Sequence, residues 1–557
     1  MKNFSINPVA AGRYGLAALA GLLLSAAFAP AELAGAGWAA PGLILFCGLG
    51  GGAARTFQAG FVAGLAHFLS SLYWLLAMPF AWHGIPLAPA LGWIALSAYG
   101  ALYFAAWVWF CWRVFPGPVA SREFSLVQSV DEFVAVPLWK RIGWAIVCAA
   151  GWTALEVARG RLLSGFPWNF LGVSQYRLLP VIQIASITGV YGVSFLMVWF
   201  SVAVGAAMLI LVRQPAGQRV WGDAALPLLA VCGVVAYGMT QFGSGPAPAR
   251  ELRVALIQPN IPQTLIFDPR DDAARFNEVI ALSEKALASK PDLLIWPESA
   301  VPDLEAENRQ TIARLLAAHP VWLVFCADSA EPSPGGGTAC FNSAYVVSPQ
   351  GAVEGIYHKR RLVIFGEYIP LVRWLPFLKW LTPISSGFDP GDRPVTFHLT
   401  HPAAIISVLI CFEDVFPQEA REHVGPDTDF LVNLTNDGWF GEGVEQWQQA
   451  ASAVFRAVEN RVPLVRCTNN GLTCWIDAQG RIREMEDAGG SIYGAGYIAP
   501  KIPLRSPGQR GRTLYNRFGD WFGWCCCGLG GLALLAGGKG AARRSPVSSD
   551  PQGSVQN

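Results

Sequence analysis

The sequence is poor in charged residues, which make up 14% of its 557 positions, against about 25% in an ordinary soluble domain. The shortage is greatest near the start, because between Tyr14 and Trp112 the only formally charged residues are Glu32 and Arg55. The net charge is +1, so no positive field would draw the chain to nucleic acid, and no such partner is expected. Much of the chain is therefore expected to lie away from water.

A regular framework of disulfides is also lacking. The twelve cysteines do not have the dense spacing of a small disulfide-stabilised domain, and most lie in apolar runs where inert thiols are expected. In the more polar region, a disulfide is compatible with the sequence among four cysteines, but no pairing can be established: Cys326, Cys340, Cys467 and Cys474.

Long apolar runs, in contrast, are abundant. A membrane-spanning helix needs about 20 mostly apolar residues. Eight candidates lie near residues 14–30, 38–51, 57–80, 87–110, 144–158, 188–212, 226–239 and 521–535, of which the second and fifth are short and the seventh is weak. The first resembles a signal peptide, but the spans that follow favour a retained helix.

The positions of lysine and arginine between these runs predict an orientation. With eight spans, both termini and the loops after spans two, four and six fall on one side, which the positive-inside rule makes the cytoplasm. This side carries Lys2, Arg13, Arg55, Arg113, Arg122, Lys140, Arg141, Arg213, Arg219, Lys539, Arg543 and Arg544. Arg159, Arg161 and Arg177 lie in an opposite loop and count against the orientation without outweighing it.

That opposite loop also contains Gly165-Phe166-Pro167-Trp168 next to the expected outer membrane surface. Two interpretations remain open: an aromatic anchor in the membrane interface, or a wall of an entry site for lipid.

The region from about Glu251 to Arg512 has the charge density of a soluble domain. Short, nearly continuous apolar runs, typical of strands covered on both faces, alternate with helical patterns. We expect strands at 254–258, 293–296, 321–325, 405–410, 430–433 and 464–466, and helices at about 271–288, 309–318 and 445–460. This alternation predicts a layered α/β sandwich.

Two of the buried runs end in a reactive residue: the run at 293–296 leads into Pro297 and Glu298, and the run at 406–410 ends at Cys411. A strand end holds a side chain rigidly, and α/β folds commonly bind ligands there. Each residue taken alone also has an ordinary structural explanation: the cysteine as a packed thiol, the glutamate as a helix cap or the partner of an arginine.

Two further residues have equally ordinary explanations when taken alone. Lys359 lies in the basic run Tyr357-His358-Lys359-Arg360-Arg361, which suits a solvated loop, and Glu367 in Phe365-Gly366-Glu367 suits a surface carboxylate.

Together and in this order, Trp-Pro-Glu, His-Lys-Arg with Phe-Gly-Glu, and Cys-Phe-Glu resemble the nitrilase superfamily and its Glu-Lys-Cys triad. The resemblance extends over about residues 254–476 and includes Asn433 and the run Asn436-Asp437-Gly438-Trp439-Phe440-Gly441. It implies an α-β-β-α sandwich with Glu298, Lys359 and Cys411 as the catalytic residues.

The membrane spans on both sides, with Ile257-Gln258-Pro259-Asn260-Ile261-Pro262-Gln263 and Ser164-Gly165-Phe166-Pro167-Trp168, resemble the apolipoprotein N-acyltransferase family of the bacterial inner membrane. The resemblance implies a transmembrane domain of seven helices at 1–243, a nitrilase-like catalytic domain on the periplasmic side at 244–512, a C-terminal transmembrane helix at 513–537 and a cytoplasmic tail at 538–557. The implied reaction moves the sn-1 acyl chain of a membrane phospholipid to the α-amine of the diacylglyceryl-cysteine of an apolipoprotein. No metal or cofactor is expected.

The chemistry fits these residue types. Glu298 would act as general base on the thiol of Cys411, which attacks the phospholipid ester, and Lys359 would stabilise the oxyanion, with a backbone N–H near Cys411 as a second donor. Lysophospholipid would leave a thioester on Cys411, and the lipoprotein amine would then attack it, in a ping-pong scheme.

The resemblance also assigns supporting roles. Glu367 and Glu413 would position Lys359 and Cys411. The remaining assignments are aromatic: Phe412, where the family often has tyrosine, so only the aromatic packing role carries over; Phe267, where it often has tryptophan; Trp168 on the membrane side; and Trp439, which suits either the site or the core.

Two alternative functions share some of these features. A membrane-tethered nitrilase or amidase would use the same triad on a C–N bond, but a soluble substrate does not explain eight spans. A non-catalytic transporter or scaffold would explain the spans but not an intact triad, and few charges mark an ion path. Residues 371–386, apolar and interrupted by proline, suit either a mobile flap or a packed loop. The sequence gives no indication of oligomeric state.

Overall fold

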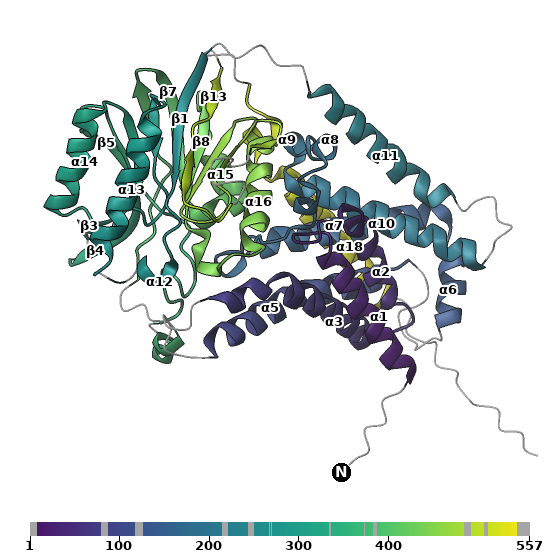
Figure 1. The fold of residues 1–557 in the computed structure, drawn as a ribbon. Coiled ribbons are helices and arrows are strands. Elements are labelled where there is room, and N and C mark those ends of the chain that lie inside the picture. The colour runs from purple at the N-terminus through teal and green to yellow at the C-terminus, as the bar shows by residue number, and fades with distance from the viewer. Residues whose placement is uncertain are drawn as a thin grey trace, which may run out of the picture.

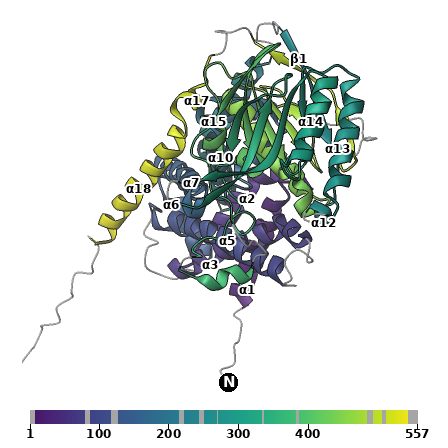
Figure 2. The same ribbon diagram turned by 90° about the vertical axis from the view of Figure 1, so that its left-hand side faces the viewer.

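The computed structural model describes residues 8–78, 87–116, 126–213, 221–242, 250–266, 268, 270–333, 336–372, 374–381, 387–483, 492–505 and 511–542. A helical bundle formed by both ends of the chain lies against an α/β sandwich formed by the middle (Figure 1). Figure 2 shows α18 (Trp521–Ala542), yellow, packing back along the helices of the first half.

Each of the eight predicted membrane segments contains a helix. The helices are α1 (Pro8–Ser25), α2 (Ala34–Cys47), α3 (Ala53–Ser71), α5 (Ala88–Arg113), α7 (Leu138–Arg159), α10 (Val190–Arg213), α11 (Trp221–Thr240) and α18. Three of them, α5, α10 and α11, are long and apolar enough to cross a membrane. A helical membrane domain is thus supported, while the count of eight spans stays a prediction.

Shorter elements connect these helices. They include α6 (Leu126–Ala135), which the sequence analysis did not identify, η1 (Tyr73–Ala77), η3 (Leu162–Ser164), η4 (Leu171–Gln175), α8 (Leu179–Ile182) and α9 (Ala185–Thr188). The last four belong to the stretch between α7 and α10 that carries Trp168, and this stretch faces the α/β sandwich.

The sandwich contains two sheets. The first has the order β12-β1-β2-β3-β4-β5, with β13 also paired to β1. Its strands are β1 (Arg250–Gln258), β2 (Leu293–Ile295), β3 (Trp322–Pro332), β4 (Thr338–Val347), β5 (Val353–His358), β12 (Gly496–Ile498) and β13 (Lys501–Leu504). The second has the order β11-β10-β9-β8-β7-β6. Its strands are β6 (Thr396–Thr400), β7 (Ala403–Ile410), β8 (Phe430–Thr435), β9 (Leu464–Thr468), β10 (Cys474–Ile476) and β11 (Ile482–Arg483).

Alternate residues of each strand point to opposite faces, and this alternation builds three apolar layers. Val324 on β3 and Val408 on β7 belong to the layer between the sheets. Leu323, on the opposite face of β3, packs with α13 (Asp272–Leu287) and α14 (Ala306–Ala318). Leu409, on the opposite face of β7, packs with α16 (Glu445–Asn460), and that layer continues into the helical bundle. The expected α-β-β-α sandwich is confirmed.

Helix α16 therefore lies between the second sheet and the helical bundle (Figure 1). Every one of its residues except Trp447 is buried. Beside it lie the short helix α15 (Pro417–Glu422) and the turn η6 (Cys411–Val415). The sandwich and the bundle thus share one continuous apolar core rather than meeting only through a linker.

The structure also answers the question of the cysteines. All twelve are free thiols, so no disulfide joins Cys326, Cys340, Cys467 or Cys474.

Candidate active site

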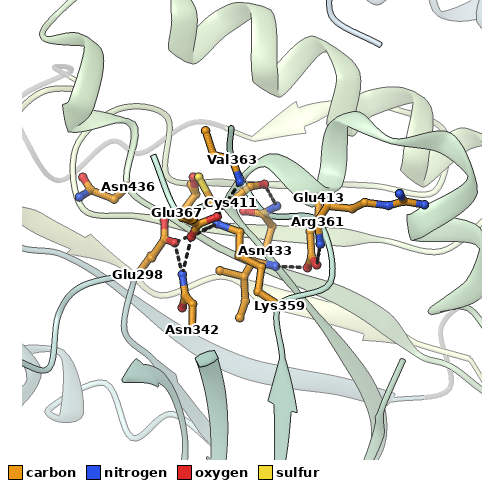
Figure 3. A network of polar contacts seen from close by, with 12 residues as sticks. Glu298, Asn342, Lys359, Arg361, Val363, Glu367, Cys411, Glu413, Asn433 and Asn436 are labelled. Carbon is orange, nitrogen blue, oxygen red and sulfur yellow. Dashed lines mark hydrogen bonds and ion pairs between the residues drawn. The ribbon is translucent and has the colours of Figure 1, made fainter. Parts of the chain in front are cut away.

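The three residues of the expected triad come from both sheets. Glu298 follows β2 and Lys359 follows β5, both in the first sheet, whereas Cys411 follows β7 in the second. Figure 3 shows their side chains pointing toward one another between the sheets. The folded chain brings together residues that are up to 113 positions apart in the sequence.

Lys359 is held by two carboxylates. Its Nζ donates to Oε1 of Glu367 at 2.8 Å and to Oε1 of Glu298 at 3.3 Å, and the side chain is only 1% exposed. Desolvation lowers the pKa of Lys359, but the charges of Glu298 and Glu367 outweigh it, so the pKa is raised well above its usual value. The residue is therefore a buried, permanent cation.

Asn342 on β4 completes this arrangement. Its Nδ2 donates to the same two oxygens, at 2.8 Å to Glu298 and 3.0 Å to Glu367 (Figure 3). The second oxygen of Glu367 accepts from the backbone N–H of Val363 at 2.9 Å. Oε2 of Glu298, in contrast, is buried and has no hydrogen-bond partner among the described residues. One carboxylate oxygen of the site is thus left available to accept a proton.

Cys411 occupies a strained backbone position, with a φ of 52° that non-glycine residues adopt rarely and mostly at functional sites. Its carbonyl oxygen accepts from Nδ2 of Asn433 and from Nε2 of Gln449, each at 3.0 Å. Burial and the charge of Glu298 raise the pKa of the thiol well above its ordinary value, against the opposing charge of Lys359. The resting sulfur is therefore protonated, and a base must remove its proton during attack.

Glu413 links the two sheets beneath the site. Its carboxylate accepts from the backbone N–H groups of Ile410 at 2.8 Å, Arg360 at 2.6 Å and Arg361 at 3.1 Å, and from the hydroxyl of Tyr357 at 2.8 Å. Ile410 precedes Cys411 and Arg360 follows Lys359, so Glu413 holds the neighbours of both residues rather than their side chains. Burial and the adjacent charge of Glu419 raise the pKa of Glu413 to about 7.

The two tryptophans of the predicted site lie in different environments. Trp168 is buried, stacks on Phe412 at a centroid distance of 6.0 Å, and donates from Nε1 to Oε1 of Gln448 at 2.7 Å. Phe412 also packs edge-on against Phe416, at 5.0 Å. The membrane-side loop therefore reaches the residue next to Cys411. Trp439 is half-buried on η7 (Asp437–Phe440).

The remaining predicted contacts are Phe267 and the segment 371–386. Phe267 lies outside the described residues. In the segment 371–386, Leu371, Trp374 and Phe377 are at least half exposed, so these residues do not form a packed loop. The hydroxyls of Tyr368, just before this segment, and Ser164 on the membrane side are 2.8 Å apart.

Sequence reasoning missed several polar residues of the site. Asn342 and Gln449 were not singled out, because each has its role only through a tertiary contact. A second set lies behind Cys411, where buried Arg466 is paired with Asp414 and, at 3.2 Å, with Asp437. The Asn-Asp-Gly-Trp motif contains Asp437 but gives no sign of this pairing. Among the described residues, no group of His, Cys, Asp and Glu side chains is arranged to hold a metal ion.

Comparison with known proteins identifies two family models in the chain. Residues 253–498 match the carbon-nitrogen hydrolase model, and residues 20–203 match the apolipoprotein N-acyltransferase N-terminal domain. An apolipoprotein N-acyltransferase of Geobacter metallireducens is 36% identical over 94% of each chain, and one of Rhodopseudomonas palustris is 31% identical over 83% of this chain and 82% of the relative. Among solved structures, an amidase of the nitrilase superfamily from Nesterenkonia aligns with 17% identity and a TM-score of 0.35, over 47% of this chain and 94% of the amidase.

Proposed function

The chain belongs to the apolipoprotein N-acyltransferase family, and from this premise we propose that it transfers the sn-1 acyl chain of a membrane phospholipid to an apolipoprotein. The acceptor is the α-amine of the N-terminal S-diacylglyceryl-cysteine. The acyl chain passes through a thioester on Cys411, so the two substrates use one site in turn. The carbon-nitrogen hydrolase domain supports this chemistry, because its matched region contains Glu298, Lys359 and Cys411.

In the first step, the carbonyl carbon of the phospholipid ester is attacked by Sγ of Cys411. Oε2 of Glu298 is unpartnered and takes the thiol proton as the C–S bond forms. Lys359 stabilises the oxyanion, since it is already a desolvated and fixed cation and needs no reorganisation. The C–O bond then breaks, and Glu298 returns the proton to the leaving lysophospholipid. The acyl chain remains bound to Cys411 as a thioester.

In the second step, the lipoprotein amine attacks the thioester. A proton leaves the nitrogen for Glu298, the C–N bond forms and the C–S bond breaks. Glu298 passes the proton to Sγ, which regenerates the thiol and releases the N-acylated lipoprotein. Glu367, Asn342 and Glu413 keep the reacting groups in place through the hydrogen bonds described above.

Membrane topology forms part of the proposal. We place the chain in the bacterial inner membrane, with a helical domain at 1–243 and 513–537 and a periplasmic catalytic domain at 244–512. Two of the three arginines that oppose this orientation are paired with acids, Arg161 with Asp520 and Arg177 with Glu32, and so add little free positive charge. Trp168, stacked beside Phe412, supports entry of lipid from the helical side, with the exposed side chains of Leu371, Trp374 and Phe377 as its cover.

The convergence of an unpartnered carboxylate oxygen, a fixed ammonium and a strained cysteine is the observation that carries the proposal. It is tested by incubating the purified protein in detergent with a phospholipid labelled in its sn-1 chain. We expect a hydroxylamine-sensitive label on Cys411, absent from Cys411→Ala and retained in Cys340→Ala, which removes a half-buried thiol of the same domain.

Addition of a diacylated lipopeptide should then move the label to its α-amine. Equal labelling of Cys411→Ala, or no thioester on the wild-type protein, would contradict the proposal. Discharge of the label to water alone would favour the membrane-tethered hydrolase instead.

A further inference from the structure

Asp328 lies beside the triad but has no part in the scheme above. It lies on β3, and in the antiparallel pairing of β3 with β4 its Cα partner is Asn342. Residues paired in this way present their side chains on the same face of the sheet. Asn342 is the residue that donates to Glu298 and Glu367, so the carboxylate of Asp328 is its neighbour on the face that carries the site.

The alternation along β3 leads to the same placement. Val324 and Cys326 belong to the apolar layer between the sheets, and Asp328 is the next residue on that face. Lys359 follows β5, and its backbone N–H donates to the carbonyl of Asn342 at 2.9 Å. Asp328, Asn342 and Lys359 thus form one row across three neighbouring strands. Asp328 is the exposed end of this row, so it lies at the mouth of the site.

Nothing in the described part of the chain neutralises Asp328. No hydrogen bond or ion pair is made to its carboxylate there, because the Nδ2 of Asn342 and the Nζ of Lys359 both point to the glutamates. Desolvation by the surrounding protein and the negative charges of Glu298 and Glu367 raise the pKa of Asp328 to about 6. It is therefore mainly ionised at neutral pH, at an electrostatic cost that the protein itself does not offset.

The charges of the site are consequently unbalanced. Three carboxylates, those of Glu298, Glu367 and Asp328, face the single ammonium of Lys359. In the same place, the buried Oε2 of Glu298 has no hydrogen-bond partner among the described residues. A thioester on Cys411 is neutral and leaves this excess unchanged. Such a site favours a ligand that is cationic and donates hydrogen bonds.

We propose that Asp328 binds the α-ammonium group of the acceptor lipoprotein at the mouth of the site. This assignment rests on the proposed acyl transfer and concerns only its second step. An α-amino group has a pKa of about 7.7–8.0 and is mostly protonated at neutral pH, so the ion pair selects an amine terminus over water and neutral nucleophiles. The ammonium loses one proton to solvent, and the amine nitrogen then attacks the thioester. Its second proton travels through Glu298 to Sγ as the C–S bond breaks.

The test separates the two half-reactions of purified full-length protein in detergent. Asp328→Asn removes the charge, Asp328→Glu keeps it, and Glu354→Gln removes an exposed carboxylate from β5 as a matched control. Formation of the Cys411 thioester from labelled phospholipid is measured first. Discharge is then followed against the concentration of a synthetic diacylated lipopeptide with a free amine, and its N-acetylated counterpart serves as a competitor without the ammonium group.

We expect all variants to form the thioester at the wild-type rate. For Asp328→Asn, the KM for the free-amine lipopeptide should rise about 10- to 100-fold, as for loss of a hydrogen bond to a charged group, with the inhibition constant of the N-acetylated competitor unchanged. Asp328→Glu should recover most of the affinity, and Glu354→Gln should behave as wild type.

An unchanged KM in Asp328→Asn, an equal loss of affinity for the N-acetylated competitor, or loss of thioester formation in both Asp328 variants would overturn the assignment. Failure of the wild-type protein to form a thioester would instead overturn the proposed acyl transfer, so the two failures are distinguishable.

Discussion

The two outer faces of the sandwich are both covered by helices, but the helices differ in what surrounds them. Helix α14, on the first sheet, buries three of its thirteen residues, Ile312, Leu315 and Leu316, and presents the rest toward solvent. Helix α16, on the second sheet, buries all but Trp447. The first is an ordinary amphipathic surface helix, whereas the second is an interior element between a sheet and the membrane helices. The catalytic domain is therefore built into the bundle on one side only.

Burial on both sides does not make α16 apolar. Gln448 donates to the carbonyls of Ala29 and Ser71 and accepts from Trp74 and Trp168, so one amide joins four points of the helical half. Glu459 accepts from the backbone N–H of Val190, at the beginning of α10. The interface with the bundle is thus held by buried polar contacts that are costly to break, whereas the polar side chains of α14 lie outside the buried core.

The largest expected effect is on the buried ion pair of α16. Arg456 donates to Glu459 and to the carbonyl of Val415, each at 3.0 Å. Arg456→Met should destabilise the protein by about 3–5 kcal/mol, because it leaves a buried carboxylate without its cation. Arg314→Met, which removes an exposed arginine from α14, should change stability by less than about 0.5 kcal/mol. Thermal unfolding in detergent, followed by tryptophan fluorescence, measures both.

The same variant carries a pH dependence. Burial raises the pKa of Glu459 to about 7, and Arg456 opposes this rise. A carboxyl whose pKa is higher in the folded state than in the unfolded state loses stabilisation as pH rises through the interval between them. Without Arg456 the folded-state pKa rises further, so the Arg456→Met penalty should be larger at pH 8 than at pH 5.5. A penalty independent of pH would argue that packing, not charge, is lost.

A smaller loss of stability, about 2–3 kcal/mol, is expected for Gln448→Leu. Several buried donors and acceptors lose their hydrogen-bond partner, while the volume of the side chain stays nearly the same. The matched variant on the other face is Gln310→Leu, at an exposed position of α14, with an effect near zero. Equal shifts of the melting temperature for the two variants would contradict the distinction between the faces.

Introducing a larger side chain should give a still smaller difference in stability between the two helices. Ala453 is fully buried on α16, whereas Ala313 is exposed on α14. Ala453→Leu has to displace its neighbours and should cost about 1–3 kcal/mol, while Ala313→Leu should be neutral or slightly stabilising. The same unfolding measurement distinguishes them, and a tolerated leucine at Ala453 would show that α16 is more loosely held than its burial indicates.

The smallest expected effect concerns the two sheets. The first sheet supplies the charged residues Glu298 and Lys359, and the second supplies the thiol of Cys411. Removal of the negative charge in Glu298→Gln should lower the pKa of Cys411 and increase its alkylation by iodoacetamide several-fold at pH 8, although acyl transfer is lost. Lys359→Gln should slow the alkylation. Mass spectrometry of the Cys411 peptide measures both, with Glu354→Gln as control. Slower alkylation of Glu298→Gln would contradict the electrostatic account.

Much of this arrangement could be predicted from the sequence. Each of the eight long apolar runs contains a helix, although α6 was missed, and the pattern at 445–460 matched α16 to the residue. The order of motifs predicted Glu298, Lys359 and Cys411 as one site, and the structure brings their side chains together at strand ends (Figure 3). Strands β4, β5 and β6 were missed, since Gly355 and exposed polar residues interrupt their apolar patterns. The short strands β10, β11, β12 and β13 were missed as well.

What the sequence could not predict depends on partners far along the chain. Gln448 and Arg456 are residue types that normally face water. The burial of Gln448 is explained only by its partners in the bundle, and that of Arg456 by Glu459 and the carbonyl of Val415 on η6. Asn342 and Asp328 have their positions from the register of β3 with β4, which no local pattern specifies. Site residues could be recognised from the sequence where they belong to a motif. They could not be recognised where only a neighbour on the adjacent strand places them in the site.

Two adjacent amides on α16 have a joint effect that neither has alone. Gln448 donates hydrogen bonds to carbonyls of the membrane half, and Gln449 donates one to the carbonyl of Cys411. Consecutive side chains of a helix point in directions about 100° apart. A single rigid turn of α16 therefore connects the helical half of the protein to the backbone of Cys411. We therefore expect a tilt of the bundle, caused by a thicker bilayer or a different detergent, to shift the backbone of Cys411. A rate measured on this cysteine should then be given together with the membrane or detergent used.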